Sequence, residues 1–553
     1  MVDRRSFIGT STLAAAGVIF DGPLTRVVAQ VRAGTPGATV QTTAGKVRGL
    51  LVDKIHAFKG VPYGASTAGA RRFLPPFRSE AWTGIRDAFE LGHRSPQIDS
   101  ALVPEFAPLN TREPYGEDCL NLNVWTPSIG SGKRPVMVWL HGGGYAAGSP
   151  GFVCYDGTEL ARQHDVVVVG VTHRLNVFGF LYLAELGGEK YADAGNAGMR
   201  DIVAALEWIR DNIAAFGGDP SNVTVFGQSG GAGKVSTLMA MPSAQGLFHR
   251  AIVQSGSAIT GMPREAATRS AEAFMERLGL RPNQVDELQK LPMQQVVEAL
   301  GAPNGGGGAG RGRGGPGGSG FNAAPVVDGR SLPADPFNPT APAMSASVPM
   351  IIGSTETEVT WNVNTNYDPP DEVGLRARVK QALRVTDAAQ ADRVIAIYRK
   401  GRPKASNLDL ALIVETDTSN FRTGTDTQAE RKAAAARAPV YMYRFQWYSP
   451  VSGGRLRAMH CMDIPFVFEN VDLCRTVVGD GKERYALADK MAGAWVAFAR
   501  TGNPNHTGLP NWQPFSADER TTMIFNNDCR VVNDPHREER LAVNALQPAR
   551  RSL

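Results

Sequence analysis

Short, continuously apolar runs that alternate with helical patterns are the feature that most restricts how this chain can fold. A run that is apolar at every position predicts a strand buried on both faces of a sheet. Between residues 199 and 215 the apolar residues instead recur at helical spacing. This order predicts an α/β fold with a mostly parallel twisted sheet, helices on both faces and its chemistry at the carboxyl ends of strands. The apolar runs are 135–140, 166–171, 223–226, 251–253 and 348–352.

A Gly-Gln-Ser-Gly-Gly motif at 227–231 directly follows one apolar run and precedes a helix-compatible run at 232–241. A serine in G-x-S-x-G between strand and helix is typical of a nucleophile on a sharp turn. The flanking glycines let backbone segments approach without Cβ clashes, and the helix N-terminus favours negative charge in front of it. Ser229 is therefore the candidate nucleophile. A phosphate-binding loop is excluded here, because Val235 and Gln228 stand where that motif requires Ser/Thr and Gly.

The sequence His-Gly-Gly-Gly at 141–144 ends the run 135–140. Loops of this type supply the backbone N–H groups that bind the oxyanion of lipases and esterases. Acyl transfer places negative charge on a carbonyl oxygen, and one preorganised donor aimed at that oxygen is worth about 3 kcal/mol. Two motifs of one chemistry at two strand ends favour an acyl-transfer enzyme.

Together with further stretches along the chain, these motifs resemble the type-B carboxylesterase family, which implies the α/β-hydrolase fold with large insertions. The resemblance implies that the amides of Gly143, Gly144 and Gly230 hold the oxyanion. Alanine is usual in the family at position 230, so a slightly looser turn is expected. The further stretches are 60–63, 72–75, 117–123, 174–179, 217–220, 254–256, 325–329 and 501–504.

The same resemblance implies roles for residues around the site. Glu117 and Arg174 are expected to form an internal ion pair that supports the oxyanion loop, and Ser255 to steady the acid and the histidine. Tyr145 and Trp361 are candidates for lining the acyl or alcohol pocket, although either also fits a place in the core.

The remaining catalytic groups should follow the serine in the order acid, then histidine. His460 lies in a segment, 458–468, that is similar to the histidine segment of the family. For the acid, the family pattern G-x-N-x-x-E starting at Gly353 implies Glu358, with Thr355 where asparagine is usual. Glu356 stays open as the alternative, because both glutamates follow the run 348–352.

These residues predict a serine carboxylesterase that forms an acyl-enzyme and needs no metal or organic cofactor. Its partner is a small-molecule ester. An acyltransferase or a hydrolase of one specialised natural ester would use the same groups and stays open. A non-catalytic adhesion relative is disfavoured because the serine, acid and histidine are all present. The net charge of +5 is too small to indicate a nucleic-acid partner, and the sequence leaves monomer and homodimer open.

Local composition predicts how the chain is divided into an N-terminal signal and one interrupted domain. Residues 1–29 combine Arg4-Arg5, a short apolar stretch and a small-residue cleavage site, which predicts a twin-arginine-type export signal and a periplasmic or secreted protein. The stretch is too short to span a membrane. Residues 30–553 are expected to form a single domain, interrupted by a flexible Gly-rich insertion at 302–320. Five sparse cysteines without paired spacing indicate neither a disulfide framework nor a zinc site.

Overall fold

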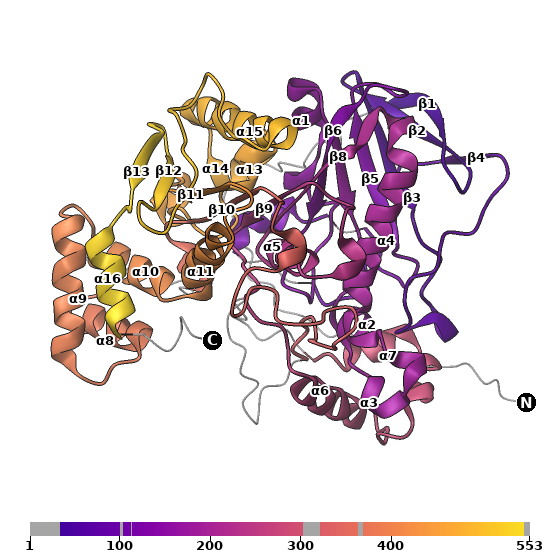
Figure 1. Ribbon diagram of the computed structural model, residues 1–553, viewed down its shortest axis with the longest axis horizontal. Helices are drawn as coiled ribbons and strands as arrows, with labels where there is room; N and C mark the ends of the chain where they lie inside the picture. The colour runs from indigo at the N-terminus through magenta and orange to yellow at the C-terminus, as the bar shows by residue number, and fades with distance from the viewer. Residues whose placement is uncertain (1–33, 100–102, 112, 302–320, 363–368, 547–553) are drawn as a thin grey trace, which may run out of the picture.

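The computed structural model describes residues 34–99, 103–111, 113–301, 321–362 and 369–546, and its centre is a large mixed sheet (Figure 1). The strands lie in the order β1-β2-β3-β5-β7-β6-β8-β9-β10-β11-β12-β13, and β4 pairs with β2. Their bounds are β1 Thr35–Gln41, β2 Lys46–Val52, β3 Ile55–Pro62, β4 Ile85–Asp87, β5 Asn121–Thr126, β6 Arg134–Leu140, β7 Val167–Val171, β8 Gly218–Gln228, β9 Arg250–Gln254, β10 Met350–Thr355, β11 Val440–Phe445, β12 Thr521–Phe525 and β13 Arg530–Asn533.

The middle of the sheet is parallel, as predicted from the apolar runs. Every neighbouring pair from β7 through β6, β8, β9, β10 and β11 to β12 is parallel. The antiparallel pairs lie at the two edges, between β1 and β7 and between β12 and β13. All five predicted runs are strands, and each is almost wholly buried because helices cover both faces.

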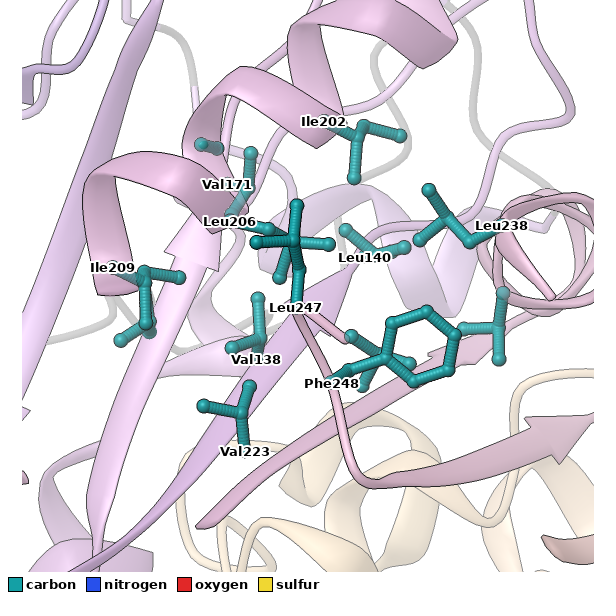
Figure 2. Close-up of a cluster of buried hydrophobic side chains, with 14 of the residues drawn as sticks. Val138, Leu140, Val171, Ile202, Leu206, Ile209, Val223, Leu238, Leu247 and Phe248 are labelled. Carbon is teal, nitrogen blue, oxygen red and sulfur yellow. The ribbon is translucent and has the colours of Figure 1, made fainter. Parts of the chain in front are cut away.

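One face of the parallel strands is covered by α4 (Ala197–Asn212) and α5 (Gly230–Leu238). Figure 2 shows Ile202, Leu206 and Ile209 of α4 beside Val138 and Leu140 of β6. This confirms the helical spacing seen in the sequence. Burial of each such side chain is worth about 1.5–3 kcal/mol, so the helix is fixed to the sheet by its apolar stripe.

The opposite face is covered by α1 (Thr158–His164), α13 (Ile464–Val467) and α15 (Glu483–Thr501). Trp495 of α15 is fully buried in the same cluster as Trp139 and Phe226, which point to this side of β6 and β8. The alternation of side chains along each strand therefore feeds two separate cores.

The remaining helices surround this three-layered body. At one end, α8, α9, α10 and α16 form a separate group with its own apolar core (Figure 1). Besides α4, α5 and α15, the helices are α1 Thr158–His164, α2 Asn176–Phe180, α3 Ala184–Gly187, α6 Arg264–Arg277, α7 Met293–Glu298, α8 Glu372–Leu383, α9 Ala388–Gly401, α10 Asn407–Asp417, α11 Asn420–Ala434, α12 Val451–Gly454, α13 Ile464–Val467, α14 Arg475–Val478 and α16 Arg537–Leu546.

Two predictions from the sequence fall outside the described ranges, namely the export signal at 1–29 and the Gly-rich insertion at 302–320. Within those ranges, none of the helices combines the length and the apolar character that crossing a bilayer requires.

Candidate active site

Ser229 occupies a strained turn between β8 and α5. Its backbone angles are φ 58° and ψ −125°, a combination that non-glycine residues rarely adopt. The turn is held by a 2.8 Å hydrogen bond from the Ser229 N–H to the carbonyl of Gln254 at the end of β9. The serine side chain is thereby raised at the carboxyl edge of the sheet, at the start of a helix, as predicted.

The glycines of the motif are required by close backbone contacts. A Cβ atom at Gly231 would overlap the carbonyl oxygen of Leu140 at the end of β6. A Cβ atom at Gly230 would overlap the carbonyl oxygen of Gly144. Glycine at position 230 therefore lets the loop after β6 pack directly on α5.

Glu358 and His460 lie together in a buried pair. Nδ1 of His460 is 2.6 Å from Oε2 of Glu358, and the exposed fractions of the two side chains are 3% and 0%. The other oxygen, Oε1, accepts hydrogen bonds from Ser255 Oγ at 2.6 Å and from the Thr355 N–H at 2.7 Å. Thr355, which stands where the family pattern has asparagine, makes this contact through its backbone.

These hydrogen bonds keep the Glu358 carboxylate charged. Burial raises its pKa, but the hydrogen bond and charge of His460, with the hydrogen bonds from Ser255 and Thr355, outweigh burial and hold the pKa below its usual range. A charged carboxylate on Nδ1 directs the other ring nitrogen, Nε2, to accept a proton.

The alternative acid, Glu356, faces a different part of the molecule. Its Oε1 accepts a hydrogen bond from Gln446 Nε2 at 3.1 Å and lies 3.5 Å from Nη2 of Arg402. Only 13% of its side chain is exposed. The structure thus brings Glu358, and not Glu356, to His460.

Gln228, the residue before Ser229, contacts His460 through its side chain. Nε2 of Gln228 lies 3.3 Å from each ring nitrogen of His460, and Oε1 of Gln228 accepts a 3.1 Å hydrogen bond from Sγ of Cys461. The ring of Phe421 packs on the imidazole with centroids 4.4 Å apart. His460 is therefore held between β8 and α11.

The loop after β6 presents unpaired backbone donors. Gly143 and Gly144 have φ of 88° and 62°, which only glycine adopts without strain. Within the described part of the chain, neither of their N–H groups donates a hydrogen bond. The first N–H groups of α5, which begins at Gly230, likewise have no partner inside the helix. These donors can bind an oxyanion in front of Ser229.

The prediction of an ion pair between Glu117 and Arg174 is wrong, because each residue has another partner. Glu117 instead binds both Nε and Nη2 of Arg72, each at 2.6 Å. Arg174 binds Asp201 through Nε at 2.8 Å and Nη2 at 2.7 Å. Both pairs are almost fully buried, and each arginine is satisfied by a bidentate partner that the sequence did not indicate.

Sequence reasoning also missed the polar network under the turn. The Gln254 carbonyl holds the Ser229 N–H, and Nε2 of Gln254 donates at 3.0 Å to Asp463 Oδ2. The same Asp463 oxygen accepts at 2.8 Å from the Tyr443 hydroxyl. The available signal was the position of Gln254 at the end of an otherwise apolar strand run. Tyr145 and Trp361, proposed to line the substrate pocket or to lie in the core, are both half-buried, which fits either place.

Comparison with known proteins identifies relatives over nearly the whole chain. The family model described as the carboxylesterase family matches residues 36–543. The chain is 34% identical over 505 residues to the para-nitrobenzyl esterase of Bacillus subtilis, covering 91% of this chain and 97% of the relative. It is 32% identical over 516 residues to the phenmedipham hydrolase of Pseudarthrobacter oxydans, covering 91% and 98%.

Solved structures agree with this similarity. The carboxylesterase of Geobacillus stearothermophilus superimposes with a TM-score of 0.76 at 36% identity, over 91% of this chain and 99% of the other. An esterase from Clostridium hathewayi gives a TM-score of 0.78 at 32% identity, over 93% and 100%. The chain therefore has the α/β-hydrolase fold.

Proposed function

Because the chain belongs to the carboxylesterase family and is a carboxylic ester hydrolase, we propose that Ser229, His460 and Glu358 carry out the reaction. The observation that carries this assignment is the 2.6 Å hydrogen bond between Glu358 and His460 beside the strained turn of Ser229. Nucleophilic catalysis by a serine requires a nucleophile, a base and a group that orients the base. The 3.3 Å contacts of His460 with Gln228, the residue before Ser229, support His460 as that base.

In the acylation step, Nε2 of His460 takes the proton from Oγ of Ser229 while Oγ attacks the carbonyl carbon of the ester. The carbonyl π electrons move onto the oxygen, which becomes an oxyanion bound by the amides of Gly143, Gly144 and Gly230. When the C–O bond breaks, the alkoxide leaves with the proton from His460. Glu358 stabilises the imidazolium that exists between these two transfers.

In the deacylation step, a water molecule takes the place of the alcohol. His460 removes one of its protons, the hydroxide attacks the acyl carbon, and the same amides hold the second oxyanion. Collapse of that intermediate returns the proton to Ser229 and releases the carboxylic acid. In both steps the backbone amides stabilise the oxyanion and Glu358 stabilises the imidazolium of His460.

The test replaces Ser229 by alanine. We expect S229A to fold as the wild type does, by circular dichroism and melting temperature, and to hydrolyse p-nitrophenyl butyrate at no more than about 10⁻⁴ of the wild-type rate, on the scale reported for loss of a triad group. A fluorophosphonate should label one site in the wild type, identified by peptide mass analysis as Ser229. Undiminished turnover by S229A contradicts the assignment.

For the substrate class, we propose uncharged esters with an aromatic alcohol. The apolar ring of Phe421 beside His460 supports this choice, as do the para-nitrobenzyl esters and phenmedipham named for two relatives. A panel of p-nitrobenzyl, cyclohexyl and choline esters of butyric acid, matched in acyl group, should give the highest kcat/KM for the p-nitrobenzyl ester. Preference for the cationic choline ester would contradict the proposal.

We also propose that residues 1–29 direct export by a twin-arginine-type route. The support is the Arg4-Arg5 pair before a short apolar stretch. Replacing both arginines by lysine should retain active esterase in the cytoplasm of an expressing bacterium. Undiminished esterase in the periplasmic fraction would contradict this route.

A further inference from the structure

Lys234 is a fully buried lysine directly behind the oxyanion loop. Its exposed fraction is 0%, and its Nζ donates hydrogen bonds of 3.0 Å to the carbonyls of His141 and Gly144. It lies four residues after Gly230, on the same face of α5, which is the face on which Gly144 packs. Among the residues that the structure describes, no carboxylate forms an ion pair with Lys234.

The loop at 141–144 is held by hydrogen bonds to every one of its carbonyls. Besides the two bonds from Lys234, the Gly142 carbonyl lies 2.9 Å from Nδ1 of His141, and the Gly143 carbonyl accepts from the Ala147 N–H at 3.1 Å. In a trans peptide the C=O and the following N–H point in opposite directions. The bonds to the Gly142 and Gly143 carbonyls therefore turn the N–H groups of Gly143 and Gly144 away from these bonded carbonyls. Lys234 fixes the peptides before and after them through the carbonyls of His141 and Gly144.

We infer that Lys234 is a positioning residue of the esterase reaction, which clamps both ends of the oxyanion loop and places a positive charge behind it. The inference rests on the function proposed above. Three consecutive glycines lose more conformational freedom on ordering than any other residues would, so an unclamped loop would be a poorly organised oxyanion site. The ammonium charge also favours the negative charge that develops on the substrate oxygen.

Stability alone does not explain a lysine at this position. Burial of an unpaired charge is costly, and replacing buried ionic groups by apolar ones of similar volume often leaves stability unchanged or raises it. The neighbouring α5 positions are all buried, and most of them are small or apolar. Burial lowers the pKa of Lys234 to about 7, so its proton is held far less firmly than that of an exposed lysine.

The titratable groups that face Lys234 come from the oxyanion loop and the end of β7. Burial, with the charge of Lys234, lowers the pKa of His141 to about 3. Burial also lowers the pKa of His173, whose ring stacks on His141 with centroids 4.8 Å apart. Burial raises the pKa of Tyr145, whose ring lies 5.5 Å from Nζ, to about 12. Within this cluster Lys234 is therefore the group that titrates near neutral pH.

The test replaces Lys234 by methionine, which has a similar length and neither charge nor donors. The matched control is Lys432 of α11, which is also buried and donates to two carbonyls, those of Ser345 and Ala346 at 2.7 and 2.8 Å, but far along the chain from the loop. With p-nitrophenyl butyrate at pH 6, K234M should lower kcat by 10- to 100-fold and change KM by less than threefold. K432M should keep kcat within twofold of the wild type.

A pH series separates the charge from a merely structural effect. The ratio of wild-type to K234M kcat/KM should fall as pH rises from 6 to 9, because Lys234, whose pKa burial lowers to about 7, loses its proton over that range. K234M should also bind a trifluoromethyl ketone, whose adduct with Ser229 carries an oxyanion, at least tenfold more weakly at pH 6. If K234M does not fold, K234Q, which has one amide donor group and no charge, takes its place.

Two outcomes overturn the inference: a K234M kcat within threefold of the wild type, or a wild-type to K234M ratio that does not change with pH. A wild type that hydrolyses none of the p-nitrophenyl esters would instead contradict the proposed function itself. An active wild type with an unimpaired K234M contradicts the role of Lys234 alone.

Discussion

Ser255 donates a hydrogen bond of 2.6 Å from its Oγ to Oε1 of Glu358. The serine has a positive φ of 54° and follows β9, while the acid follows β10, so the contact joins two adjacent parallel strands at their carboxyl ends. It occupies the carboxylate oxygen that His460 does not use. The side chain thereby fixes the rotation of the acid, and through it the plane of the imidazole.

Replacing Ser255 by alanine should lower kcat by about tenfold at unchanged KM, because loss of one hydrogen bond to a buried charge costs about 1.5–3 kcal/mol before the site relaxes. Ser257 is the matched control, since its hydroxyl is buried and has no partner in the described part of the chain. S257A should keep the wild-type rate. Equal losses in the two variants would contradict a role for the hydrogen bond.

The two glutamates after β10 should respond differently to the same substitution. E358Q removes the charge on Nδ1 of His460 and should lower kcat by about 10⁴, the scale of a triad acid changed to its amide. E356Q alters the contacts with Arg402, Gln446 and Tyr448 and leaves those of His460 in place, so it should cost less than tenfold. Steady-state rates on one short ester, after circular dichroism of both proteins, decide between them. Inactive E356Q beside active E358Q would reassign the acid.

The buried pair of Arg174 and Asp201 should matter for stability far more than a surface pair. D201N leaves the Arg174 charge buried without compensation, and we expect a loss of about 3–5 kcal/mol in the free energy of unfolding. The control is D87N, because Asp87 and its partner Arg48 are 45% and 40% exposed. Urea midpoints should fall clearly for D201N and hardly move for D87N. Similar midpoints for both would show that Arg174 finds another partner.

All five cysteines are free thiols, and four of them are buried. Burial raises the pKa of Cys119, Cys154, Cys461 and Cys474, so these thiols are both inaccessible and protonated at neutral pH. Cys529 is half-buried and should react first. Titration with a disulfide reagent should therefore count about one thiol in the folded protein and five after denaturation. Fewer than five would reveal a disulfide.

Shortening residues 305–320 to a few glycines should barely change the melting temperature, since the entropy of loop closure varies slowly with length. Phe321, which resumes the described chain, packs on Phe274 of α6 and must be retained. Thermal melts of the two proteins make the comparison. A fall of many degrees would mean that the deleted segment packs against the domain.

The local features of this protein were predictable because neighbouring residues determine them. The strand, the turn at Ser229 and the start of α5 lie within one short segment, and the glycines that the turn needs stand inside the motif itself. For Glu358 the local sequence was not enough, because Glu356 follows the same strand, and the choice between the two came from the spacing to Gly353 in the family pattern.

The buried ion pairs were not predictable in the same way. Glu117 could have paired with any arginine that the fold brought to it, and tertiary packing delivers Arg72 rather than Arg174. Lys234 likewise binds the backbone of a distant segment. The carbonyls that accept its hydrogen bonds, those of His141 and Gly144, precede it by 93 and 90 residues. The sequence indicated a special role for Lys234 only by placing a lysine in the helix after the nucleophile, which has to be buried.

The separation of the acid and the base along the chain has a consequence for the protein while it is being made. Glu358 and His460 are 102 residues apart, and both follow Ser229 in the sequence. A growing chain on the ribosome therefore presents its serine long before β11 and the histidine exist to activate it. On the proposed assignment, a chain that ends before residue 460 lacks the base and should not hydrolyse esters, even though it already carries Ser229 and Glu358.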